Sequence, residues 1–179
     1  SATYFDTKIY DLITYTGWTT GTQSGAKYDN IQEASSSGLE LSTLISLPSN
    51  LKTKLWYTHL KTNVEKNGNY GGDANWPDGK DLLRRPRKSG GFTVSKSSEA
   101  YNISLDGSYT GGRWDYQSSN IRLWNKPFWN FDVYAEHSLD AFSNHYNLKP
   151  FIKIKNIFDD ERPEILNVES PGRTTKVGI

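Results

Sequence analysis

Few residues in this sequence combine the type and the spacing that catalysis needs. The three histidines, His59, His137 and His145, fall on different predicted strands or turns, and cysteine is absent. The lack of cysteine excludes disulfide bonds, thiolate metal sites and cysteine nucleophiles. No nucleophile motif accompanies the histidines, so we expect them to be structural. We therefore predict no catalytic residue, no cofactor and no enzymatic activity.

Two acidic clusters carry the oxygen ligands that divalent cations prefer. One is Asp159–Glu161, and the other comprises Asp73, Asp78 and Asp81 in a glycine-rich segment. Several carboxylates can hold a cation when they converge on one point. Acidic residues between strands are more often solvated loop residues. The sequence therefore predicts no metal site.

The strongest local charge is the segment RRPRK, which contains Arg84, Arg85, Arg87 and Lys88. A basic patch can mark a nucleic-acid interface. Here the run is short, and the chain has 21 basic and 20 acidic residues, for a net charge of +1. The sequence therefore predicts no binding to nucleic acid. Strand-like alternation would place Arg85 and Arg87 on one face and Arg84 and Lys88 on the other.

The elements that position these residues are predicted to be β-strands, because apolar and polar residues alternate with a period of two. In YNISLDGSYT, for example, the odd positions from Tyr101 to Tyr109 are apolar or glycine, and the even positions are polar. No segment has convincing helical periodicity. We predict about eight strands, at residues 3–15, 38–47, 51–62, 88–97, 101–110, 130–140, 146–155 and 173–179.

The predicted connections alternate between short turns and long loops. The short ones lie at 48–50, 97–99 and 141–144, and the long ones at 16–27, 63–83, 112–127 and 159–172. This alternation, with strands of about 10 residues between, is typical of outer-membrane β-barrels. A soluble β-sandwich also has alternating strands, but regular alternation of loop length is less expected of it. We therefore favour an all-β fold of antiparallel transmembrane strands.

One predicted strand ends abruptly in the segment KNIFDDERP. Asn156 and Asp159 are residue types that hydrogen-bond nearby backbone and support turns. Asp160 to Arg162 are expected to lie in water, and Pro163 lacks the N–H that further pairing would need. The sequence therefore predicts that this strand stops at the outer rim of the barrel.

Several segments resemble, in order, the strands of TonB-dependent outer-membrane receptors. LLRRPRKSG resembles a strand start in that family, KNIFDDERPE its Asn-Leu-Phe-Asp element, and SPGRTTKVGI its Pro-Gly-Arg entry into the closing strand. Further matching segments are SATYFDTKIYDLI, YDNIQEASSSGLEL and LWYTHLKT. The order and spacing of these segments match the family over essentially the whole chain.

This resemblance implies that residues 1–179 are the C-terminal part of a receptor barrel of roughly 22 strands. Nothing in the sequence resembles the family's plug domain or TonB box, so both are expected to lie outside this chain. The implied function is uptake of a large, scarce nutrient, a cobalamin or a ferric siderophore, driven by TonB acting on the plug. The implied location is the outer membrane of a Gram-negative bacterium. The Leu-Arg-Arg-Pro element points toward the cobalamin-receptor branch.

The resemblance also suggests roles for two sets of residues. Aromatic residues make up 13% of the chain, and those on the long loops offer flat, rigid surfaces to a ligand. These candidates are Tyr70, Trp76, Trp114, Tyr116 and Trp124. Other aromatics, such as Trp129 and Tyr57, suit a girdle at the membrane interface. The basic residues Arg84, Arg85, Arg87 and Lys88 are expected to contact the plug or lipopolysaccharide phosphates, which arginine binds in a bidentate manner.

Two alternatives remain open at this point. A free-standing eight-stranded outer-membrane barrel can close with its interior filled by side chains. A secreted carbohydrate-binding β-sandwich would use the tryptophans as platforms for sugars. The first predicts a heat-modifiable protein of the size of this chain alone, and the second predicts solubility without detergent.

Overall fold

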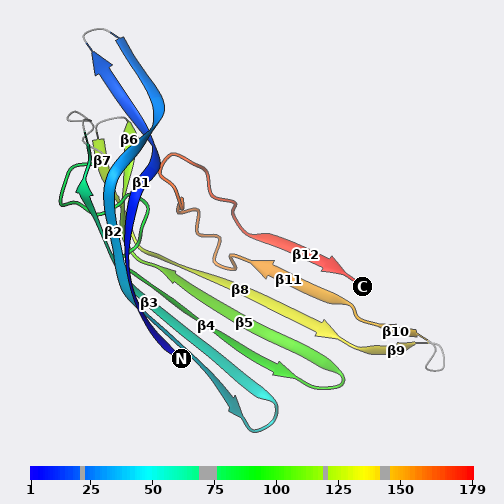
Figure 1. Cartoon of the computed structure of the whole chain (residues 1–179). Coiled ribbons are helices and arrows are strands. Elements are labelled where there is room, and N and C mark those ends of the chain that lie inside the picture. The colour runs from blue at the N-terminus through cyan, green and yellow to red at the C-terminus, as the bar shows by residue number, and fades with distance from the viewer. Residues whose placement is uncertain (21–22, 69–75, 119–120, 142–145) are drawn as a thin grey trace.

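The computed structural model describes residues 1–20, 23–68, 76–118, 121–141 and 146–179, and they form a curved, open β-sheet with two small hairpins attached (Figure 1). The main sheet has eight antiparallel strands in the order β1-β2-β3-β4-β5-β8-β11-β12. Within the described residues, no helix has the length and apolar character needed to cross a membrane. The all-β antiparallel fold predicted from the sequence is confirmed.

The strands of the main sheet have the following bounds: β1 Ala2–Thr20, β2 Gln23–Leu47, β3 Leu51–Lys66, β4 Lys88–Ser97, β5 Tyr101–Thr110, β8 Phe128–His137, β11 Phe151–Lys155 and β12 Thr174–Gly178. The first small hairpin pairs β6, Arg113–Ser118, with β7, Ile121–Asn125. The second pairs β9, Leu139–Ala141, with β10, Tyr146–Leu148.

The register gives the sheet one apolar and one polar face. Leu105 lies between Val94 on β4 and Val133 on β8, whereas Asp106 lies between Thr93 and Asp132. Side chains on the apolar face remain exposed in large numbers: Leu39, Leu41, Ile45, Leu47, Leu55, Tyr57, Ile103, Leu105, Trp129 and Ile152. Soluble monomers rarely expose an apolar surface that extends over so many strands.

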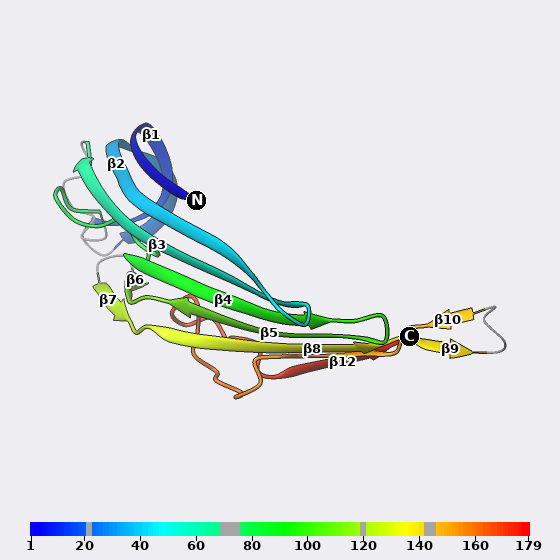
Figure 2. The ribbon, with the colours of Figure 1, turned by 90° about the horizontal axis from the view of Figure 1, so that it is seen from below.

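The two ends of the sheet differ in the length of their connections. The turns from β2 to β3 and from β4 to β5, together with the β9–β10 hairpin, lie at one end (Figure 2). The 76–87 loop and the β6–β7 hairpin lie at the other end (Figure 2). The sheet therefore has one end with short turns and one end with long loops, as predicted.

The buried core lies at the long-loop end. It consists of Ile31, Ala34, Val64, Trp76, Leu82 and Leu83, with Ile9, Leu12 and Tyr116 packed against it. The amide of Leu82 donates a hydrogen bond of 3.1 Å to Oγ1 of Thr62. Thr62 pairs with Ser36 on the polar face of the sheet. The 76–87 loop therefore folds over the polar face and buries its leucines there.

Two sequence-based boundaries were wrong. The loop predicted at 16–27 is almost entirely strand, because β1 and β2 stay paired out to Thr20 and Gln23. Threonine favours strands, and cross-strand pairing there outweighs the local glycines. The loop predicted at 112–127 contains the β6–β7 hairpin. The turn predicted at 141–144 fits the antiparallel pairing of β9 with β10 on either side of it, and residues 142–145 themselves lie outside the described part.

Candidate functional site

Three connections meet over the polar face at the long-loop end, and Asp115 on β6 joins them. Its side chain is fully buried. Oδ1 accepts hydrogen bonds from Nε of Arg84 at 2.8 Å and from the amide of Tyr116 at 2.8 Å. Oδ2 accepts one from the amide of Leu166 at 2.9 Å. A buried carboxylate is tolerated when it is paired and hydrogen-bonded in this way.

Arg84 holds the 76–87 loop against the β6–β7 hairpin. Its amide donates to the carbonyl oxygen of Trp114 at 2.7 Å. Its guanidinium carbon lies 4.7 Å from the centre of the Tyr116 ring, within the range of a cation–π contact. Burial acts to lower the pKa of Arg84, but the hydrogen bond and charge of Asp115 outweigh it and the pKa is raised. The cation is therefore fixed as a structural partner of Asp115.

The 156–173 connection is attached to the same hairpin. Arg113 donates to the carbonyl oxygen of Glu164, and Nδ2 of Asn125 donates to the carbonyl oxygen of Pro163 at 3.2 Å. Arg113 and Asn125 are both buried. The three connections therefore form one hydrogen-bonded layer rather than three independent loops.

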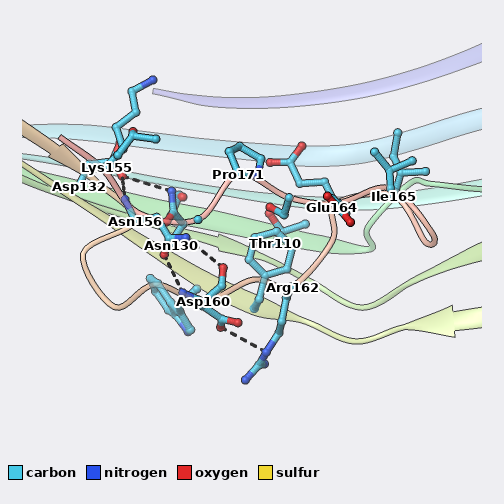
Figure 3. Close-up of a pocket in the computed structure, with 18 residues that line it drawn as sticks. Thr110, Asn130, Asp132, Lys155, Asn156, Asp160, Arg162, Glu164, Ile165 and Pro171 are labelled. Atoms are coloured by element: carbon cyan, nitrogen blue, oxygen red, sulfur yellow. Dashed lines mark hydrogen bonds and ion pairs between the residues drawn. The ribbon is translucent and has the colours of Figure 1, made fainter. Parts of the chain in front are cut away.

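A first hollow lies between the polar face and the 156–173 connection (Figure 3). It has a volume of about 560 Å³. On its floor, Oδ1 of Asp132 accepts hydrogen bonds from the amide of Asn156 at 2.9 Å and from Nδ2 of Asn130 at 3.3 Å. On its wall, Asp160 and Arg162 form an ion pair of 3.2 Å. Other acidic and basic residues that line it are Lys155, Glu164 and Glu169.

A second hollow of about 520 Å³ lies between the 77–87 loop and the β6–β7 hairpin. Oδ2 of Asp81 accepts hydrogen bonds from Nε and Nη2 of Arg87, at 3.1 and 2.8 Å. Nη2 of Arg122 donates to the carbonyl oxygen of Asp81 at 2.9 Å, and its guanidinium lies 5.5 Å from the centre of the Trp114 ring. Burial lowers the pKa of Arg122, and the Asp81 charge opposes this. Lys80 lines the same hollow.

The two hollows differ in their chemistry. The first offers four carboxylate side chains and two cations, together with hydroxyl and amide groups. The second offers three cations, one carboxylate and an indole ring. Among the described residues, no group of three or more His, Asp or Glu is placed to hold a metal ion.

The aromatic residues predicted to contact a ligand are distributed unevenly. Trp114 and Trp124 lie opposite each other on the hairpin, with ring centres 5.3 Å apart in an edge-to-face arrangement, and both are exposed. Tyr116 is half-buried beneath Arg84. Trp76 is only 8% exposed and belongs to the apolar core. Tyr70 lies outside the described residues. Ligand contact by these residues stays a prediction.

The predicted basic cluster is split by the fold. Arg84 pairs with Asp115 and Arg87 with Asp81, while Arg85 is exposed. Lys88 begins β4 opposite His59, on the apolar face. Strict alternation over these residues was wrong, because residues 81–87 form a loop in which Arg84 has a positive φ of 58°. The cluster therefore divides between the polar face and the apolar face.

Sequence reasoning missed the residues that organise the site. Asp115 directly follows a tryptophan in the segment RWDY, and Arg122 lies two residues before a tryptophan in the segment IRLW. An acid and a cation alternating with aromatics on a predicted loop was a signal for a hairpin with one buried and one exposed side. Lys80 and Asp132 carried no comparable signal. Each lines a hollow only because a segment distant in the sequence folds next to it.

A family model described as "TonB dependent receptor-like, beta-barrel" matches residues 1–157. No curated protein matches the chain. Among solved structures, the siderophore receptor PiuA from Acinetobacter baumannii aligns with a TM-score of 0.70 and 16% identity, over 98% of this chain and 25% of that chain. The copper transporter OprC aligns with a TM-score of 0.71 and 16% identity, over 97% of this chain and 28% of that chain.

The pyoverdine receptor FpvA from Pseudomonas aeruginosa PAO1, bound to pyoverdine, aligns with a TM-score of 0.66 and 14% identity. That alignment covers 98% of this chain and 26% of that chain. The chain thus spans about a quarter of the length of these structures. At such identities the likeness concerns the fold, and it does not separate a cobalamin receptor from a siderophore receptor.

Proposed function

Because this chain belongs to the TonB-dependent receptor-like β-barrel family, we propose that it forms the C-terminal part of an outer-membrane uptake receptor of a Gram-negative bacterium. The remaining strands, the plug domain and the TonB box would lie in the rest of the receptor. The family is one of transport receptors, and the proposal includes no covalent chemistry.

The observation that carries this proposal is the exposed apolar face opposite a polar face. An apolar band over eight strands fits contact with lipid, and the polar residues opposite fit a water-filled or plug-filled lumen. The exposed rings of Tyr57 and Trp129 on the apolar face suit the interfacial girdle. The end with long loops would face the outside and the end with short turns the periplasm.

We place ligand capture at the outer end, where the two hollows open over the polar face. The ligand would be a large, scarce metal chelate, either a ferric siderophore or a cobalamin. Two of the similar structures are named as siderophore or pyoverdine receptors and one as a copper transporter. This range of names supports metal uptake as the general class. Transport inward would require TonB acting on the plug.

The basic residues fit two supporting roles in this receptor. Lys88 lies on the apolar face next to the outer rim, which suits contact with lipopolysaccharide phosphates. Arg85 is exposed on the 76–87 loop, so it can reach either the plug or the solvent. Arg84 would act through Asp115 on the position of the hairpin rather than by direct contact.

Uptake by intact cells tests the proposed function. Cells that carry the natural-length receptor as their only receptor of this kind should accumulate labelled ferric siderophore or cobalamin, and the same cells without TonB should not. Extraction of the protein from cells without detergent would instead support a soluble sandwich. Heat-modifiable migration at the size of this chain alone would support a free-standing eight-stranded barrel. Either result would overturn the proposal.

A further inference from the structure

The chain has one asparagine followed by glycine, at 67–68, and two aspartates followed by glycine, at 78–79 and 106–107. A glycine nitrogen is not shielded by a Cβ, so the carbonyl carbon of the preceding side chain can approach it. We propose that Asn67 is a site of spontaneous modification, where its amide is converted to aspartate and isoaspartate through a cyclic imide formed with Gly68. The inference does not depend on the proposed function.

The reaction needs only these neighbouring residues and water. The backbone nitrogen of Gly68 bonds to Cγ of Asn67, the bond from Cγ to Nδ2 breaks, and the proton of the attacking nitrogen leaves with Nδ2 as ammonia. Water then opens the imide at either of its carbonyl carbons. One opening gives aspartate with the original backbone. The other gives isoaspartate, in which the backbone runs through Cβ and Cγ and the former main-chain carbonyl becomes a free carboxylate.

The backbone of this pair lies beyond the ladder of the sheet. β3 ends at Lys66, its last residue paired with β2, opposite Glu33. Gly68 has a φ of +82°, in the left-handed region that glycine adopts without strain. Within the described part of the chain, no hydrogen bond engages the Gly68 amide. The attacking nitrogen can therefore turn toward the Asn67 side chain without breaking a bond of the fold.

The two aspartate–glycine pairs are held differently. The amide of Gly79 donates a hydrogen bond of 2.8 Å to the carbonyl oxygen of Val64. Gly107 lies inside β5, which is paired with β4 on one side and β8 on the other. A nitrogen bonded in this way must lose its acceptor before it can attack. An ionised carboxylate is also a weaker electrophile than an amide. The structure and the chemistry therefore both single out Asn67.

The modification acts on the contact between the end of β3 and the 76–87 loop. The amide of Asn67 donates a hydrogen bond of 2.7 Å to Oδ1 of Asp78. Conversion adds a carboxylate to the residue that holds this acid, and like charges at close range repel each other. Isoaspartate also lengthens the backbone at this point by a methylene group. The contact should therefore weaken, and the loop that carries Trp76 and Lys80 should loosen.

The test follows conversion in the natural-length receptor, purified in detergent and incubated at neutral and at alkaline pH. Trypsin releases residues 67–80 as one peptide, because Lys66 and Lys80 border it. Mass spectrometry measures the change from amide to acid, and fragmentation assigns it to Asn67. Enzymatic methyl labelling detects the isoaspartate product.

Two variants serve as controls. Asp106→Asn creates the same dipeptide inside β5, and it keeps an acceptor for the hydrogen bond of 2.6 Å that Oγ1 of Thr93 donates to Asp106. It therefore matches the chemistry of Asn67 in a different structural setting. Asn67→Gln keeps an amide at the site but would have to close a larger ring, so it should not convert on the same timescale.

We expect Asn67 to convert at least about ten-fold faster than the pair introduced by Asp106→Asn, because only the latter must first lose a ladder hydrogen bond. After unfolding in guanidinium chloride, the two pairs should convert at similar rates. The rate at Asn67 should rise with pH, because attack requires the Gly68 nitrogen to lose its proton.

Cleavage of the native receptor after Lys80 reports the loosening of the loop. In the folded loop the carbonyl oxygen of Lys80 accepts a hydrogen bond of 2.9 Å from the amide of Val64. Trypsin should cut there faster in receptor that has been aged at alkaline pH than in fresh receptor. Asn67→Gln should show no such difference after the same incubation.

Three results would overturn the inference. In the first, Asn67 converts no faster than the pair introduced by Asp106→Asn in the folded receptor, so its setting gives it no advantage. In the second, Asn67 stays an amide at alkaline pH while the unfolded protein converts, which means that the fold holds Gly68 away from the side chain. In the third, Asn67 converts but cleavage after Lys80 is unchanged, which removes the effect on the loop.

Discussion

Arg84 and Asp115, 31 residues apart in sequence, form an ion pair of 2.8 Å in which the carboxylate is fully buried and the arginine side chain is 36% exposed. The pair joins the 76–87 loop to the β6–β7 hairpin. Through Leu166 the same carboxylate also holds the 156–173 connection. One side chain therefore takes part in holding all three segments, and its removal should loosen them together.

Asp115→Asn should release this layer. Arg84 and the Leu166 amide donate to different oxygens of Asp115, and only one terminal atom of an asparagine side chain is an acceptor, so one of these partly buried donors loses its partner. We expect a loss of about 1–3 kcal/mol in the local stability of the layer, discounted toward the lower value because Arg84 can reach water. Limited proteolysis should show faster cleavage within residues 113–125 and 160–172.

The control for this variant is Glu161→Gln, which neutralises an exposed acid in the 156–173 connection. It should be cleaved at the rate of the unmodified protein. If Asp115→Asn is cleaved no faster than this control, the carboxylate does not organise the three connections.

The assignment of the two faces predicts that the same substitution will have effects of different size at two neighbouring positions on β5. Leu105→Arg places a charge on the apolar face and should lower the free energy of unfolding by about 2–4 kcal/mol, if that face meets the middle of the bilayer. Ser104→Arg places the same charge on the polar face and should change it far less. The measurement is denaturant unfolding in phospholipid vesicles. Equal losses would contradict the assignment of faces.

Gly107 provides a test of packing on the apolar face. A Cβ at this position would lie 2.5 Å from Cε1 of Phe92 and 3.1 Å from Cε1 of Phe131, so both rings pack over the glycine. Gly107→Val should displace them and destabilise the sheet by about 1–3 kcal/mol. The change is measured as a lower temperature for loss of heat-modifiable gel migration. Ser108→Val, on the exposed neighbouring position, should have a smaller effect, and a reversed order would refute the packing argument.

The turn after β11 should depend on Asp159. Its Oδ1 accepts a hydrogen bond of 2.6 Å from the amide of Arg173, which precedes β12, and its φ is +57°. Asp159→Ala removes the acceptor and places alanine in the left-handed region, and we expect a cost of about 1–2 kcal/mol. Asp159→Asn keeps both properties and should cost much less. Hydroxyl-radical footprinting of β12 should detect the difference, and similar footprints for the two variants would exclude this role.

The regular part of the fold could be predicted from the sequence because alternation and register reinforce each other. The strands predicted at 88–97 and 101–110 are found with those bounds. The turn at the end of β11 was also predicted: Oδ1 of Asn156 accepts from the amide of Asp160, and Asp159 accepts from Arg173. In each case the signal lies within a few neighbouring residues.

The outer layer could not be predicted in the same way. Asp115 reads as one acid in a polar loop, and its role arises only when Arg84 and Leu166 approach from 31 and 51 residues away. Trp76 lies in a segment with the composition of an exposed loop, yet the 76–87 loop folds inward and buries it in one cluster with Val64 and Ala34. Such contacts depend on loop folding, for which periodicity has no signal.

The length of the first hairpin affects where the sheet unfolds locally. β1 has 19 residues and β2 has 25, whereas a membrane-crossing strand needs about 9–11. β2 pairs with β3 only from Glu33 onward, so in the described part of the chain residues 23–32 pair with β1 alone. A two-stranded ribbon in water is marginally stable. Amide hydrogens near the free end of this ribbon should therefore exchange with solvent through local fraying. Those of β4 and β5 should exchange only when the whole sheet unfolds.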